Sequence, residues 1–129
     1  MSILLDTHVW VWFVEGSKRL PAATRRLIEH NLDSSHLSAI SRWEVAMLAR
    51  KGRLRLDRDA ESWSARAQQL VAVIEEPVTG RIAFAASRLD QIADPADAFI
   101  AATSRELDIP LVTLDERLRG IRGVKTRTR

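Results

Sequence analysis

The chain has 129 residues, and 46% of them are hydrophobic, which is enough to form the core of one domain. It has no cysteine, which excludes a disulfide framework and thiolate metal sites and agrees with a reducing compartment. No stretch approaches the roughly eighteen apolar residues of a membrane span, and the N-terminus lacks the basic segment of a signal peptide. We therefore expect a single domain over residues 1–129, located in the cytoplasm and without a membrane partner.

The net charge is only +3, but the basic residues are unusual in kind and in distribution. All of them except Lys18, Lys51 and Lys125 are arginine, whose planar guanidinium group suits phosphate oxygens. They gather in two clusters, one over residues 50–58 and one over residues 117–129. The candidate RNA contacts in these clusters are Arg50, Lys51, Arg53, Arg117 and Arg119. A solvated basic face and contact with RNA phosphates explain the clusters about equally well.

The first half of the chain alternates short apolar strands with helical patterns. The predicted elements are a strand over residues 3–5, a short buried helix or turn over 9–14, a helix over 20–28 and a strand over 36–40. Ser41 and Glu44 then match the S-x-x-E capping box, so a helix is predicted to start there and to end at Gly52.

The second half is predicted to continue the alternation. An amphipathic helix covers residues 63–74, with Trp63, Ala67, Leu70 and Ile74 on its apolar face. Residues 73–78 fit either the end of this helix or a strand, and we favour a helix followed by a strand. The remaining predicted elements are a short helix from Gly80 through Leu89, a helix over 94–107, a strand over 111–114 and a last strand over 124–127. This order predicts an α/β fold with a central, mostly parallel sheet of about four to five strands flanked by helices.

The helix predicted over residues 94–107 begins with acidic residues. Asp94 suits the N-cap, Pro95 the first helical position, where a missing N–H costs nothing, and Asp97 the first turn. The residues behind them are apolar on more than one face, so the helix is predicted to be buried and to hold the Asp97 carboxylate rigidly.

Four acids stand where a predicted strand ends or a predicted helix begins: Asp6, Glu44, Asp97 and Asp115. The carboxyl ends of parallel strands meet at one edge of a sheet, where ligands bind at the switch in strand order. Each acid alone is readily explained as a cap or as a partner of a helix dipole. Their joint placement favours a metal site, and a set of oxygen ligands suits Mg²⁺ or Mn²⁺ rather than zinc.

The chain resembles the PIN-domain ribonucleases, specifically the VapC-type toxins of type II toxin–antitoxin modules, and the resemblance covers essentially its whole length. The motifs that carry it are, in order, Leu4-Leu5-Asp6-Thr7-His8, Ser38-x-x-Ser41-x-Trp43-Glu44-Val45, Asp94-Pro95-x-Asp97 and Leu111-Val112-Thr113-Leu114-Asp115-Glu116-Arg117. The resemblance implies one PIN domain, a metal-dependent endoribonuclease that cleaves RNA, inhibition by a cognate antitoxin, and a homodimer. It places Asp6, Glu44, Asp97 and Asp115 at the family's acidic metal-binding positions and Thr113 at the hydroxyl beside the last acid. Ala98 departs from the pattern, because many relatives have arginine there.

The chemistry of such a site suggests a role for each residue. Asp6 and Asp97 are expected to bind one or two Mg²⁺ ions directly, and Asp115 directly or through water. Glu44 is expected either to bind the metal or to act as a base on the attacking water. The Thr7 and Ser41 hydroxyl groups are expected to support these ligands by hydrogen bonds. His8 is interpreted as a packing or hydrogen-bonding residue. The tryptophans, Trp10, Trp12, Trp43 and Trp63, are interpreted as structural residues of the core or of an interface.

Two other classes of protein are alternatives to the nuclease. A phosphoacceptor receiver domain resembles its family only with paired acids after the first strand and a lysine after a late one, and Asp6 has no acidic neighbour. A catalytically silent PIN-like module that binds the antitoxin without turnover stays open, although the four acids are intact. Cleavage of DNA rather than RNA also stays open.

Overall fold

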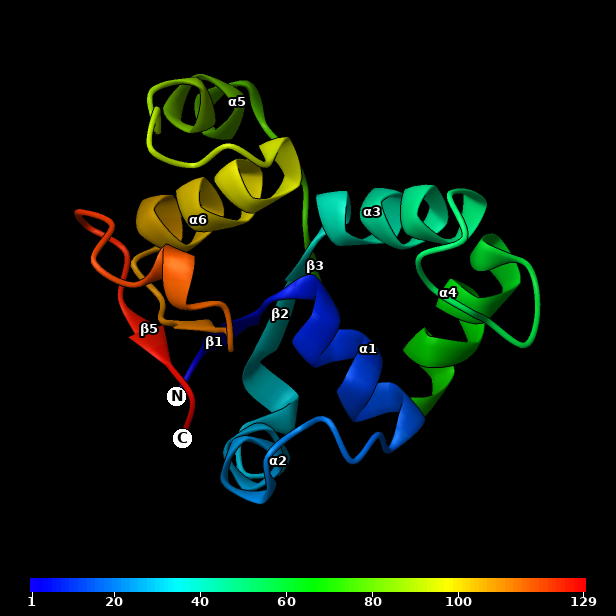
Figure 1. Cartoon of the computed structure of the whole chain (residues 1–129). Helices are drawn as coiled ribbons and strands as arrows, with labels where there is room; N and C mark the ends of the chain where they lie inside the picture. Colours follow the sequence, from blue (N-terminus) through cyan, green and yellow to red (C-terminus); the bar gives the residue numbers. More distant parts are fainter.

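The computed structural model describes residues 1–129, which form a five-stranded parallel sheet flanked by six α-helices (Figure 1). The strand order is β3-β2-β1-β4-β5, and every neighbouring pair runs parallel. The strands are β1 Ile3–Leu5, β2 Ser35–Ser38, β3 Ile74–Glu76, β4 Leu111–Val112 and β5 Thr126–Arg127. From β1 the chain adds β2 and then β3 on one side of the sheet, and afterwards adds β4 and β5 on the other side of β1. The strand order therefore switches between β1 and β4. The predicted α/β fold with a parallel sheet is confirmed.

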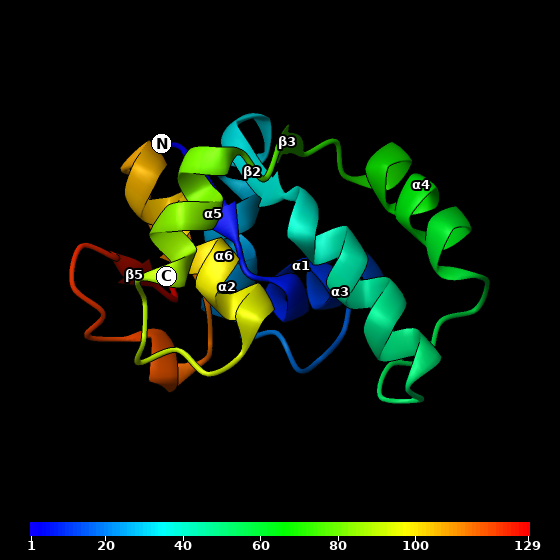
Figure 2. The same ribbon diagram turned by 90° about the horizontal axis from the view of Figure 1, so that it is seen from above.

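The helices divide between the two faces of the sheet. They are α1 Thr7–Glu15, α2 Ala22–Glu29, α3 Ala39–Arg50, α4 Ala60–Leu70, α5 Gly80–Ser87 and α6 Pro95–Leu107, with short 3-10 helices at Leu32–Ser34 and Glu116–Leu118. Figure 2 shows α4 at the periphery beyond α3, on the side away from α5 and α6. No helix has both the length and the apolar character needed to cross a membrane.

Strand β1 lies at the centre of the core, and its three residues are fully buried. Alternate residues of a strand point to opposite faces. Ile3 and Leu5 accordingly pack with residues of α1 to α4, whereas Leu4 packs with α5, α6 and β4. Burial on both faces is the reason that β1 is a continuous apolar run rather than an alternating one.

The predicted capping box is wrong. Helix α3 begins at Ala39, because β2 ends at Ser38 and the Ser38 hydroxyl accepts the N–H of Ile40 at 3.2 Å. Ser41 therefore lies inside the helix, and its hydroxyl accepts a hydrogen bond from Thr7 Oγ1 at 2.8 Å. The second strand also ends two residues earlier than predicted. Ser38, three residues before Ser41, is also a suitable N-cap, and the pairing of β2 with β1 and β3 determines that Ser38 takes this position.

The amphipathic helix predicted over residues 63–74 is displaced. Helix α4 ends at Leu70, and β3 begins at Ile74, which confirms the preference for a helix followed by a strand. Trp63 and Ala67 are buried as expected, but Leu70 and Ile74 are 57% and 44% exposed. β3 is an edge strand of the sheet, and Ile74 and Glu75 in it are exposed.

The other elements lie close to their predicted positions. The segment predicted as a short helix or turn after β1 is the nine-residue helix α1, and the last strand covers only Thr126–Arg127. Trp10 and Trp63 pack edge to face in the core, with ring centroids 5.2 Å apart. Trp43 is 52% exposed, so of the two structural roles expected for the tryptophans, core or interface, the core is excluded for Trp43.

Candidate active site

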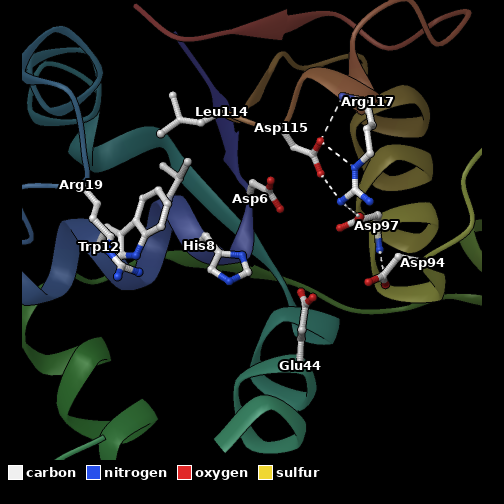
Figure 3. Close-up of a pocket in the computed structure, with 11 residues that line it drawn as sticks. Asp6, His8, Trp12, Arg19, Glu44, Asp94, Asp97, Leu114, Asp115 and Arg117 are labelled. Atoms are coloured by element: carbon white, nitrogen blue, oxygen red, sulfur yellow. Dashed lines mark hydrogen bonds and ion pairs between the residues drawn. The ribbon is translucent and has the colours of Figure 1, made fainter. Parts of the chain in front are cut away.

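A pocket of about 350 Å³ opens at the carboxyl ends of β1 and β4, where the strand order switches (Figure 3). In an open parallel sheet this is the crevice where ligands bind. Its lining comprises Asp6, His8, Val9, Trp12, Arg19, Glu44, Asp94, Asp97, Leu114, Asp115 and Arg117. The fold therefore brings all four predicted acids together, although 109 positions of the chain separate the first from the last.

Asp6 is held by two hydrogen bonds at the end of β1. Its Oδ1 accepts the N–H of Thr7 at 2.9 Å as the N-cap of α1, and its Oδ2 accepts Thr113 Oγ1 at 2.6 Å. The same Thr113 hydroxyl accepts the N–H of Asp115 at 3.0 Å, so it joins the ends of β1 and β4. Burial raises the pKa of Asp6, and the bonds from Thr113 and Thr7 oppose this rise.

Three carboxylates form the most compact acidic group. Glu44, Asp94 and Asp97 each offer an oxygen, and these atoms lie within 4.8 Å of one another. Asp94 also caps α6, where its Oδ1 accepts the N–H groups of Ala96 and Asp97 at 2.9 and 3.4 Å. Asp94 was predicted only as a cap. The spacing of Asp94 and Asp97, one helical turn apart, was the signal that could have added it as a ligand.

The electrostatics of this group favour a bound cation. Burial, followed by repulsion from Asp6 and Asp94, raises the pKa of Asp97 to about 7. Burial also raises the pKa of Glu44, and Glu44 Oε1 is buried without a hydrogen-bond partner. A buried oxygen without a partner is costly unless a ligand satisfies it. The donor set is oxygen only and anionic, so the residues fit a hard divalent cation.

Asp115 is paired with a guanidinium group. Arg117 donates from Nε to Asp115 Oδ1 at 3.0 Å and from Nη2 to Oδ2 at 2.7 Å. The same Nη2 lies 3.8 Å from Asp97 Oδ2. These contacts hold the pKa of Asp115 below its usual range. Arg117, predicted as an RNA contact, thus lies at the rim of the acidic group and is engaged with it.

The predicted supporting residues connect α1 to α3. Thr7 donates its hydroxyl hydrogen to Ser41 Oγ, and both residues are buried. Thr7 also supports Asp6 through its backbone N–H. Ser41 thus acts on Asp6 through Thr7, because its own bond runs to Thr7 rather than to a carboxylate.

The other predicted RNA contacts lie outside the pocket. Arg50 ends α3, Lys51 and Arg53 follow it in an exposed turn, and Arg119 is exposed after the last 3-10 helix. Sequence reasoning missed Arg19, which lines the pocket from the segment between α1 and α2, and it gave His8 and Trp12 no part in the site. The spacing of His8 and Trp12, four residues apart after Asp6, was the available signal.

The family model of the PIN domain matches residues 3–124. The chain is also 37% identical over 123 residues to Ribonuclease VapC22 of Mycobacterium tuberculosis. The matched residues make up 94% of this chain and 92% of that protein. The chain belongs to the PIN domain family.

Solved structures share the fold of this PIN domain. A DNA-bound VapBC complex from Salmonella typhimurium matches with a TM-score of 0.74 at 16% identity, over 98% of this chain and 97% of that chain. VapBC2 from Rickettsia felis, bound to a DNA fragment from its promoter, matches with a TM-score of 0.72 at 16% identity, over 98% of both chains. At these identities the likeness establishes the PIN architecture, with the acidic pocket of this PIN domain at its switch point.

Proposed function

We propose that this PIN domain is a metal-dependent endoribonuclease and the toxin of a type II toxin–antitoxin module. One observation carries the proposal: Asp6, Glu44, Asp94, Asp97 and Asp115 line one pocket at the switch in strand order. The name of the 37% identical relative, a ribonuclease, supports RNA as the substrate. We further propose that residues 1–129 act as one domain.

The proposed cofactor is Mg²⁺ or Mn²⁺. Glu44, Asp94 and Asp97 would hold the ion, and Asp6 and Asp115 border the same pocket. When bound, such an ion lowers the pKa of a water molecule and stabilises the charge that develops on phosphodiester oxygens. Burial and then repulsion from Asp6 and Asp94 raise the pKa of Asp97, and a bound cation would offset this repulsion.

The side chains of the pocket have distinct tasks in this mechanism. Thr113 and the Thr7 N–H hold the Asp6 carboxylate in one orientation and favour its ionised form. Glu44, whose pKa is raised by burial, would either bind the cation or act as the base on the attacking water. Arg117 at the rim supplies a positive charge beside the acids.

The proposed partners are a cognate antitoxin and a second copy of the chain. The structural relatives include two VapBC structures bound to DNA and a toxin–antitoxin complex from Klebsiella pneumoniae. We propose that an antitoxin likewise binds this chain and keeps it inactive, and that the chain forms a homodimer.

The test is incubation of purified, partner-free protein with total cellular RNA and, in parallel, with single-stranded DNA. Each substrate is incubated with Mg²⁺, with Mn²⁺ or with EDTA, and new ends are mapped. We expect discrete, metal-dependent ends in RNA for the wild type and for Asp90→Asn, an exposed acid outside the pocket, and none for Asp97→Asn. Unchanged RNA under every condition supports the catalytically silent module instead. Cleavage of DNA alone would show that the substrate is DNA rather than RNA.

A further inference from the structure

The pocket has a second wall that differs in chemistry from the acidic one. His8 and Trp12 of α1, together with Arg19 from the following segment, face the acids across the hollow (Figure 3). His8 and Trp12 are four residues apart and so lie on the same side of the helix. Their ring centroids are 5.7 Å apart and their planes are tilted by 53°. The wall is therefore aromatic and basic.

Trp12 is anchored on one side and open on the other. It packs against the core cluster that contains Trp10 and Leu5, yet it remains partly exposed and lines the pocket. The core thus holds the indole ring in position without covering it. A fixed, partly exposed aromatic ring beside a polar cleft is a platform on which a nucleobase can stack.

Arg19 is the unengaged cation of the pocket. Its side chain is exposed, and its guanidinium makes no hydrogen bond or ion pair, whereas Arg117 is committed to Asp115. The acidic wall repels the phosphates of an RNA strand, so binding requires positive charge elsewhere in the pocket. A free guanidinium group meets this requirement because it pairs with phosphate oxygens.

We propose that His8, Trp12 and Arg19 form a subsite for one nucleotide adjacent to the cleaved phosphodiester. The base stacks on Trp12 with His8 at its edge, and Arg19 contacts the flanking phosphate. The subsite rests on the proposed function, since it takes its substrate from the neighbouring acids. Stacking accepts any base because each has a π-face, so the subsite supplies affinity and position more than sequence readout.

The proposed stacking of a base on Trp12 is tested with short oligoribonucleotides that span a mapped cleavage site. Each carries an abasic residue at one position, and together the set covers every position in turn. For the wild type, we expect one abasic position next to the cut to lower kcat/KM by roughly tenfold. Trp12→Leu, which keeps an apolar side chain in the core contact, should lower kcat/KM on the intact substrate by a similar factor. The kcat/KM of Trp12→Leu should not fall further when the same position is abasic, because this variant has no aromatic ring on which that base could stack.

The matched controls are Trp12→Phe and Trp43→Leu. Trp12→Phe keeps a stacking ring and should retain most of the wild-type penalty at the abasic position. Trp43 is exposed on α3 and lies outside this pocket, so Trp43→Leu should behave as the wild type. Melting temperatures of all variants confirm that each is folded, and the wild-type abasic series needs no substitution at all.

The phosphate half is tested with Arg19→Gln and its sequence neighbour Lys18→Gln, because Lys18 is exposed but does not line the pocket. Arg19→Gln should raise KM several-fold at moderate salt and flatten the dependence of affinity on salt, whereas Lys18→Gln should change neither.

Four outcomes are decisive. A uniform response of the wild type to every abasic position overturns the subsite while RNA cleavage stands. An equal abasic penalty in wild type and Trp12→Leu, or equal effects of Arg19→Gln and Lys18→Gln, also overturns it. Absence of cleavage by the wild type on every RNA overturns the proposed function and the subsite together.

Discussion

Arg117 holds both carboxylate oxygens of Asp115, at 3.0 and 2.7 Å, while its Nη2 lies 3.8 Å from Asp97 Oδ2. A fixed positive charge therefore stands at the edge of the acidic group that is proposed to hold a divalent cation. Two cations that approach the same carboxylates repel one another, and the shared oxygens cannot serve both fully.

We therefore expect Arg117→Gln to bind Mn²⁺ a few-fold more tightly than the wild type. The measurement is direct Mn²⁺ titration by calorimetry or by electron paramagnetic resonance. Arg119→Gln removes the same charge from an exposed position outside the pocket and serves as the control. Weaker Mn²⁺ binding by Arg117→Gln than by Arg119→Gln would show that Arg117 supports the ion rather than competes with it.

Asp97 makes the stability of the metal-free protein depend on pH. Its pKa is about 7 in the folded chain against 3.8 for the ordinary group, so the folded state binds the proton more tightly. The penalty for ionised Asp97 is absent below about pH 4 and complete above about pH 7, and it amounts to no more than about 4 kcal/mol. In EDTA, Asp97→Asn should therefore be more stable than the wild type at pH 8, with a smaller difference at pH 5.

This prediction is checked by denaturant unfolding at both pH values, with Asp90→Asn as the exposed control. Saturating Mn²⁺ at pH 8 should stabilise the wild type and leave Asp97→Asn nearly unchanged. If the acids were only helix caps, Asp97→Asn would lose about 0.3–1 kcal/mol in EDTA and Mn²⁺ would have no effect.

Thr113 orients Asp6 through a hydrogen bond of 2.6 Å inside the protein. Thr113→Val keeps the shape but removes the hydroxyl, which should raise the pKa of Asp6 further and lower RNA cleavage by about 10–100-fold. Thr113→Ser should recover most of the activity. Thr103→Val is the control: that buried hydroxyl donates to Phe99 O within α6, so its loss should affect stability without affecting cleavage.

Induced expression of the chain without an antitoxin should arrest growth, and Asp6→Asn or Asp97→Asn should abolish the arrest. Each substitution keeps the side-chain shape but removes a charge on which the cation depends, and cleavage should fall by about a hundredfold or more. Growth curves with matched expression levels, verified by immunoblot, provide the measurement. Equal toxicity of the wild type and both variants contradicts the proposed mechanism.

Arg50, Lys51 and Arg53 lie outside the pocket, so their proposed contact with RNA is with the backbone alone. Replacing all three with glutamine should weaken RNA binding uniformly across sequences. If each contacts one phosphate, the slope of log affinity against log salt should fall by about two. An unchanged slope identifies the cluster as a solvated basic face.

Much of the architecture could be predicted from the sequence because its elements are determined by patterns of residues that are close together in the chain. The apolar run Ile3–Leu5, the acids at the start of α6 and the alternation of strands and helices were sufficient for the fold class. The positions of Asp6 and Asp115 followed from the rule that the carboxyl ends of parallel strands share one edge. Each of these features depends on residues that are neighbours in the chain.

Tertiary contacts decided the rest. The capping-box pattern favours Ser41 over Ser38 as the helix cap, but the pairing of β2 with β1 and β3 selects Ser38, and Ser41 then bonds to Thr7. The length of α4 was misjudged because residues 70–74 are apolar at helical spacing, although Leu70 and Ile74 are exposed.

Which further residues line the pocket, and how they pair with the acids, also depended on the tertiary structure. The place of Asp94 beside Glu44, the engagement of Arg117 with the acids and the unpaired Arg19 opposite them depend on segments that are far apart in the sequence. Hydrogen bonding within a turn and the period of an apolar pattern act over a few residues, so the sequence by itself determined the elements and their chemistry. Which charges face one another, and which are left without a partner, depends on packing between distant segments, and only the tertiary structure decided it.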